Sequence, residues 1–284
     1  STSTSTSTST STSTSTSTMT TNLQTSYIHA KAVILSLLFF ALLSGCETGS
    51  FNKTAYPFQI NTEKLEATSV ENVIVANVNF GGPSKTYLHD YENKIDSVVK
   101  DRLKQGGYAV QDNALFKKAW REAVRKYGEP YSPVTSQINA MAFRRVMYTV
   151  LTTLKEESDI DAVVFTDLIE REIAFSAGQS RAAKWDGVTR KPKIKGGASG
   201  ISAGFDWSQT VPAVSISVTI YHVDAEQLFQ SIGGIEVTRQ LDPNKGGNGR
   251  FVRRDKIFSS KNNIREGVSL ALHPFVTMKN YRGN

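Results

Sequence analysis

The chain has 284 residues, of which 39% are hydrophobic and 21% charged, and its formal net charge at pH 7 is +7. This composition is that of a globular protein and excludes a largely disordered chain. The single cysteine, Cys46, excludes a disulfide framework. The positive charge favours anionic partners, such as lipid headgroups, acidic glycans or nucleic acid.

The chain opens with a Ser-Thr repeat over residues 1–18. Such a tract has no apolar side chains to bury and cannot compensate the entropy lost on ordering. We therefore expect residues 1–18 to be disordered or not to belong to the native protein, whose start would then be Met19.

Residues 19–45 have the layout of a secretory signal peptide. Lys31 supplies a positive charge in front of an apolar run over 32–43, which only Ser36 interrupts. A helix that spans a membrane needs about 20 apolar residues, so this run is too short for one. The alternative is a buried core helix that happens to end in cysteine.

The end of that segment, Leu43, Ser44, Gly45 and Cys46, resembles a bacterial lipobox. The resemblance implies that the cysteine is lipidated and becomes the N-terminus after cleavage, so that membrane lipid holds the protein through acylated Cys46. Glu47 in place of aspartate implies an outer-membrane lipoprotein that faces the periplasm. Export makes nucleic acid the least expected partner, and we predict none.

After the lipobox, residues 46–68 are polar and aperiodic, which predicts a tether. A domain is expected over 69–284, and its elements follow from apolar periodicity, caps and turn residues. In chain order we expect a strand at 73–80, helix 90–106, strand 108–111, helices 113–127 and 137–154, strands 161–175, 213–223 and 228–239, and helix 262–273. This β-α-β-α-α-β-β-β-α order, with its late β-meander, predicts an α/β (α+β) fold with a mixed sheet flanked by helices.

Two segments rich in glycine and basic residues, 176–212 and 241–256, interrupt this pattern as insertions. Long loops in a compact domain are commonly functional or disordered. Both segments flank the last strands, so we expect them at one end of the sheet, where they would form a basic rim. Two solvated loops are the alternative. The rim would consist of Arg181, Lys184, Arg190, Lys191, Lys193, Lys195, Arg250, Arg253, Arg254 and Lys256.

The lipobox, tether and element order together resemble the curli secretion channel lipoprotein group, whose relatives include the lipoprotein activator of penicillin-binding proteins and a lipoprotein of Pel polysaccharide export. The resemblance rests on VIVANVNF at 73–80, DIDAVVFTDLIE at 159–170 and the meander at 214–240. It implies a binding or scaffold component of cell-envelope assembly, with an envelope protein or an acidic glycan as partner.

The alternative is a homo-oligomeric subunit of a secretion or export complex. In the curli channel, hairpins that correspond to 176–212 and 241–256 join those of neighbouring subunits. Residues 201–207 alternate between apolar and polar side chains, as a strand of such a hairpin would.

Residue patterns that carry chemistry are weak in this chain. No histidines or carboxylates have metal-ligand spacing, so we predict neither a metal site nor a cofactor. His222 is expected to be a hydrogen-bonded core imidazole. The paired acids Glu156 with Glu157 and Glu170 with Glu172 could flank a glycosidic bond, as in an envelope hydrolase. Such pairs are common on strands and helix ends, so we predict that the protein is not an enzyme.

Glycine pairs do not form a phosphate-binding loop here, because none follows a strand, opens a helix and ends in the required lysine. The pair Gly233 and Gly234 lies inside a strand pattern. It predicts a β-bulge or a close approach of another backbone.

Overall fold

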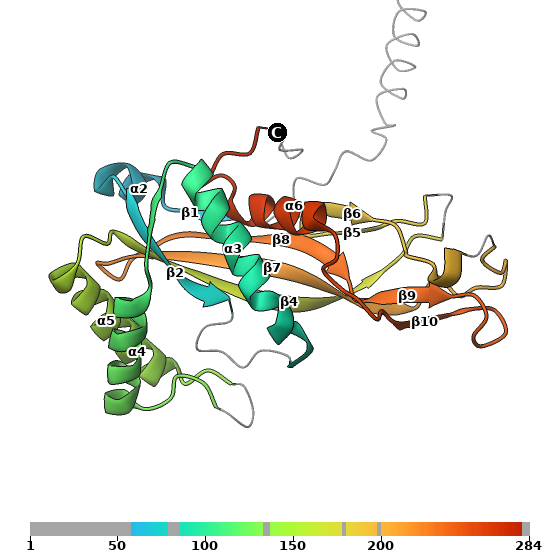
Figure 1. Ribbon diagram of the computed structural model, residues 1–284, viewed down its shortest axis with the longest axis horizontal. Coiled ribbons are helices and arrows are strands. Elements are labelled where there is room, and N and C mark those ends of the chain that lie inside the picture. The colour runs from blue at the N-terminus through green and yellow to red at the C-terminus, as the bar shows by residue number, and fades with distance from the viewer. Residues whose placement is uncertain (1–57, 79–85, 133–136, 178–179, 198–199, 280–284) are drawn as a thin grey trace, which may run out of the picture. The chain divides into compact units, whose positions relative to one another are not determined.

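The computed structural model describes residues 58–78, 86–132, 137–177, 180–197 and 200–279, all within one compact unit (Figure 1). The Ser-Thr repeat, the predicted signal peptide and the predicted lipobox at Cys46 lie outside the described residues. Among the helices that are described, none is both long and apolar enough to cross a membrane.

A six-stranded sheet forms the centre of this unit, in the spatial order β1-β8-β7-β4-β2-β3. Strand β2 pairs in parallel with β3 and β4, and the remaining pairs are antiparallel. The predicted mixed α/β fold is therefore confirmed. The strands are β1 (Gln59–Ile60), β2 (Asn72–Val78), β3 (Ala109–Gln111), β4 (Ala162–Ala174), β7 (Thr210–His222) and β8 (Gln227–Val237).

Helices cover both faces of the sheet. They are α2 (Thr62–Thr68), α3 (His89–Gln105), α4 (Ala114–Tyr127), α5 (Ala140–Glu157) and α6 (Lys261–Leu272), with 3-10 turns η2 (Thr86–Leu88) and η3 (Lys195–Gly197). Val73 and Val75 pack into the core under α3 and α6, whereas Ile74 and Ala76 pack under α4 and α5. Strand β2 is thus buried on both faces, which explains its apolar run at 73–76.

The start of the folded domain differs from the prediction. Residues 59–68, expected within the tether, form β1 and α2, and β1 adds to the edge of β8. Asn61 caps α2 through Lys64 N, and the Lys64 ammonium lies 3.2 Å from Glu226 beyond the end of β7. Because these contacts join the segment to the sheet, the part of the tether that is described belongs to the domain. Helix α5 also starts later than expected, at Ala140, since Asn139 caps it.

Both insertions lie beside the far ends of β4 and β7, as expected, but they are not structureless (Figure 1). The first contains the hairpin β5 (Ala183–Trp185) and β6 (Val188–Arg190), and the second belongs to the hairpin β9 (Arg239–Asp242) and β10 (Arg250–Arg253). Ile194 bridges to Leu241 and joins the two segments.

The prediction of a strand at 201–207, made from the alternation of apolar and polar side chains, is wrong. These residues form turns, and the Phe205 ring lies 5.4 Å from the Phe251 ring, centroid to centroid. Phe251 also stacks on Phe175 at 5.5 Å. The apolar residues of this stretch therefore fill a local core rather than one face of a strand.

The predicted close approach at Gly233 and Gly234 is confirmed. A Cβ on Gly233 would lie 2.0 Å from the carbonyl oxygen of Gly267 in α6, and one on Gly234 would lie 2.4 Å from Val188 in β6. A register shift between Val214 and Ser215 marks a bulge beside this pair. Helix α6 and the β5–β6 hairpin therefore contact the same point of β8 from opposite faces.

One acid on β4 has an unusual environment. Asp167 lies opposite Ser217 and is exposed, on the side of the sheet where Val163 and Phe165 pack against α4 and α5. Desolvation by the surrounding protein nevertheless raises the pKa of Asp167 to about 6. Desolvation, and then the charge of nearby Asp167, raise the pKa of Tyr131 to about 12.

We expect the substitution Gly233→Ala to lower the free energy of unfolding by about 3 kcal/mol, because the added methyl group overlaps the backbone of α6. Urea unfolding measures this. Gly204→Ala is the matched control, since its Cβ would meet only the flexible Asn248 side chain at 3.2 Å. A change of less than about 1 kcal/mol is expected there. Equal stability of Gly233→Ala and wild type would contradict the close contact.

Asp167 should make the protein less stable as pH rises. Its folded pKa lies above the value of about 3.9 expected in the unfolded chain, so the native state binds the proton more tightly. The unfavourable contribution therefore grows from about pH 4 to about pH 6 and is complete above that range. Asp167→Asn should raise the melting temperature at neutral pH and leave it unchanged near pH 4. A gain of the same size at both pH values would refute this account.

Candidate functional site

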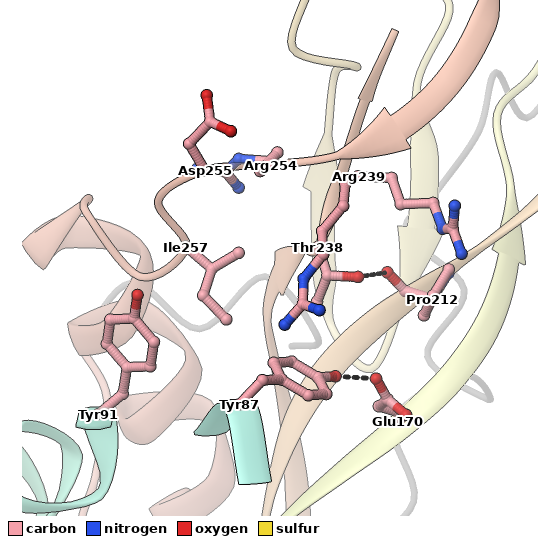
Figure 2. Close-up of a pocket in the computed structure, with 10 residues that line it drawn as sticks. Tyr87, Tyr91, Glu170, Pro212, Thr238, Arg239, Arg254, Asp255 and Ile257 are labelled. Carbon is pink, nitrogen blue, oxygen red and sulfur yellow. Dashed lines mark hydrogen bonds between the residues drawn. The ribbon is translucent and has the colours of Figure 1, made fainter. Parts of the chain in front are cut away.

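A cleft of about 520 Å³ opens between the start of α3, strands β4 and β7, and the β9–β10 hairpin (Figure 2). Glu170 of β4 and Pro212 of β7 lie on its sheet side. Thr238 joins β8 to β9 and bonds to the Pro212 carbonyl through both its backbone N–H, at 3.0 Å, and its hydroxyl, at 3.1 Å. These bonds hold the β9–β10 hairpin against the sheet and define one wall.

Tyrosines form the opposite wall. The Tyr87 hydroxyl donates a hydrogen bond to the Glu170 carboxylate (Figure 2). The Arg253 guanidinium lies 5.1 Å from the centroid of the Tyr87 ring, a cation–π distance. Tyr91 packs edge-on against Phe258 at 5.1 Å. Burial, and then the charge of Glu172, raises the pKa of Glu170.

Two arginines carry the positive charge of the cleft. Arg239 of β9 and Arg253 of β10 are directly opposite in the hairpin register, and both side chains are exposed. Among the described residues, no carboxylate lies within ion-pair distance of either guanidinium. Like charges directly opposite on neighbouring strands repel. An anion between them would relieve that repulsion.

A second, smaller pocket of about 80 Å³ adjoins the cleft and shares Arg239 and Arg254 with it. We call it the basic pocket. Its remaining charged and amide residues are Arg190, Lys191, Lys193, Glu236 and Asn263. Residues from the first insertion thus meet the second insertion and the first turn of α6 at this point.

The predicted rim contains one residue that is not on the surface. Arg254 and Glu236 form an ion pair in which each side chain is only 4% exposed. Arg254 also donates to the Val237 carbonyl at 2.8 Å, and the second Glu236 oxygen accepts from Phe258 N. The prediction that Arg254 belongs to an exposed rim is therefore wrong. Its charge is neutralised by Glu236 inside the domain, and this pair holds the segment after β10 in place.

The other predicted rim residues divide into three groups, and Arg253 is the one that lines the larger cleft. Arg190 is paired with Glu266 at 2.8 Å and Lys193 with Glu236 at 3.5 Å, and both line the basic pocket together with Lys191. The rest line neither cavity, and several have partners: Lys195 lies 3.6 Å from Asp242, and Arg181 lies 5.3 Å from the Trp207 ring. The residues outside both cavities are Arg181, Lys184, Lys195, Arg250 and Lys256.

Arg239 and Tyr87 belong to the site, although neither is predicted from the sequence. Arg239 stands just before the second insertion and was assigned to the end of a strand. Its importance comes from the β9–β10 register, which places it opposite Arg253. No local pattern marks Tyr87, because its partner Glu170 is 83 residues away in the chain.

Other residues considered for chemistry lie elsewhere. His222 is 9% exposed, and its Nδ1 accepts a hydrogen bond from Asp224 N at 3.2 Å, which confirms a hydrogen-bonded core imidazole. Within the described ranges, no three His, Cys, Asp or Glu residues come together as a metal site. Glu170 lines the cleft and Glu172 does not.

The cleft offers groups suited to a ligand that carries both a ring with an apolar face and an anionic group. Tyrosine rings offer apolar faces, the exposed arginines offer a positively charged fork, and Glu170 offers an acceptor. No protein-family model matches the chain, and no curated protein matches it.

The buried ion pair should be important for stability. Glu236→Gln leaves the Arg254 charge buried without a counterion, and we expect it to lower the free energy of unfolding by about 3–5 kcal/mol. Lys195→Gln, which removes a half-exposed pairing with Asp242, should cost less than about 1 kcal/mol. Chemical denaturation of both variants tests the contrast. Similar small losses in both would show that the Arg254–Glu236 pair is solvated.

Proposed function

We propose that the protein is a lipoprotein anchored in the outer membrane through acylated Cys46, and that its periplasmic domain is a non-enzymatic binding component of cell-envelope assembly. We further propose that the cleft binds the acidic group of a glycan. The lipobox pattern supports the anchor, and the geometry of the cleft supports the ligand class.

The observation that carries the ligand class is the opposition of Arg239 and Arg253. The two residues are paired in the hairpin register and line the same cleft, and among the described residues neither guanidinium has an acidic partner. Each guanidinium can bind the two oxygens of a carboxylate or the oxygens of a phosphate. Arg254, by contrast, is already neutralised by Glu236.

The aromatic wall favours a saccharide as the carrier of that anion. Tyrosine rings pack well against the apolar faces of pyranose rings, and hydroxyl groups of a sugar can bond to Glu170 and Thr238. Glu170 accepts from Tyr87, and this bond orients its carboxylate. A binding role therefore needs no further group, whereas hydrolysis would need a second carboxylate placed across the glycosidic bond.

Assembly into a secretion or export complex remains the alternative. It rests on the resemblance to the curli channel group alone. Light scattering of the detergent-extracted lipoprotein decides it, since a large discrete ring would favour the export complex over a tethered accessory protein.

The glycan proposal predicts the behaviour of the double variant Arg239→Gln with Arg253→Gln. Its affinity for an oligogalacturonate, used as an acidic probe, should fall at least about tenfold, because two charge-assisted hydrogen bonds are lost. Titration calorimetry on the detergent-extracted full chain measures this. Its stability should not fall, since the like-charge repulsion is also removed.

Arg250→Gln is the matched control, because Arg250 lies in the same hairpin opposite Asp242 and outside the cleft. We expect its affinity for the probe to change by less than about twofold. A neutral oligosaccharide of the same length should bind weakly to every variant. Equal binding of the acidic and neutral probes, or unchanged binding by the double variant, would rule out the acidic-glycan cleft.

A further inference from the structure

The second concentration of basic residues lies on α4, away from the cleft. Phe116, Ala119, Trp120 and Ala123 form the buried face of this helix. Its other positions are strongly basic and mostly exposed, with Glu122 as the one acid within the helix. The basic residues are Lys117, Lys118, Arg121, Arg125 and Lys126. No carboxylate of the described residues lies within ion-pair distance of them.

The neighbouring helix α5 exposes large apolar side chains beside more basic residues. Met141 is 57% exposed and Tyr148 66% exposed, and Arg144 and Arg145 lie between them on the same helical stripe. Ile138, just before the helix, is 53% exposed. Among the described residues, the only other exposed large hydrophobic side chain is Phe58.

The basic face of α4 and the exposed stripe of α5 adjoin at Tyr127. Hydrogen bonds from Thr149 and Lys126 lower the pKa of Tyr127, and the charges of Lys126 and Arg145 lower it further. Tyr127 and Phe143 pack against the same core cluster, so the C-terminal end of α4 lies next to the Arg145 turn of α5. The acids Glu156 and Glu157 lie about two turns beyond Tyr148. We call the combined surface the α4–α5 face.

We propose that the α4–α5 face docks onto an anionic lipid surface. A cluster of lysines and arginines is attracted to anionic headgroups, and exposed aliphatic and tyrosine side chains enter the boundary between headgroups and acyl chains. Tyrosine is enriched at that depth of a bilayer. A hydrated polyanion such as a glycan would satisfy the charges but would leave Met141, Tyr148 and Ile138 in water.

This inference is independent of the cleft. The α4–α5 face lies at the opposite end of the sheet from the β9–β10 hairpin (Figure 1). Docking through it would leave the cleft free for its ligand. The two proposals can therefore fail separately.

The test is flotation of the full chain with vesicles of phosphatidylethanolamine and phosphatidylglycerol, compared with phosphatidylcholine vesicles. Every protein carries Cys46→Ala, so that no acyl chain contributes and the apolar segment at 32–43 is the same throughout. The α4 variant Lys118→Glu, Arg121→Glu, Arg125→Glu should bind the anionic vesicles at least about tenfold more weakly. Binding of the parent should weaken as salt rises.

A control with the same charge change is Lys245→Glu, Arg250→Glu, Lys256→Glu, whose side chains are exposed on and after the β9–β10 hairpin. Its affinity should fall less than about threefold. The variant Met141→Ser, Tyr148→Ser keeps the charge and should also bind severalfold more weakly. If the α4 variant fails to fold by thermal melting, the same three positions are changed to glutamine.

Three results would overturn the proposal. They are equal losses in the α4 variant and its control, parent binding that does not depend on anionic lipid, and full binding by the Met141→Ser, Tyr148→Ser variant. The first would indicate general charge attraction, the second insertion of the 32–43 segment, and the third a site for soluble polyanions.

Discussion

Two adjacent glycines in β8 set the geometry of the domain. They let α6 pack closely on one face of the strand and the β5–β6 hairpin on the other. Gly233 lets the backbone of α6 approach one face of the strand, and Gly234 lets the β5–β6 hairpin approach the other. The Gly234 N–H donates to the Asp186 carbonyl at 2.8 Å, and the Asp186 carboxylate accepts from Ser215 and from Arg171, each at 2.6 Å. Any side chain at this point would move α6 or the hairpin away from the sheet.

The candidate site depends on that contact because its walls come from the two layers. The β5–β6 hairpin leads directly to Arg190, Lys191 and Lys193, and α6 supplies Asn263 and the Glu266 that pairs with Arg190. Between them, the buried Arg254–Glu236 pair holds the segment after β10. Neighbouring arginines thus have different tasks: Arg254 points inward as a structural charge, while Arg253 stays exposed at the cleft.

Part of this organisation could be predicted. Apolar periodicity located the central strands and the three long helices, since each must bury one face or, for β2, both. The Asp186–Gly187 pair between Trp185 and Val188 is a strong hairpin signal that the sequence analysis overlooked. Recognising it would have replaced one basic loop by a docked hairpin, but would not have shown where the hairpin docks.

By itself, the sequence determined the mixed α/β class, the order of the main elements and the presence of a close backbone approach at Gly233 and Gly234. These follow from local periodicity and from the absence of a Cβ. Only the tertiary structure decided which of the basic residues in the described part of the chain are neutralised and which face solvent without an acidic partner. Pairings such as Arg254 with Glu236, Arg239 opposite Arg253 and Tyr87 with Glu170 depend on strand register and layer packing, which residue types alone do not encode.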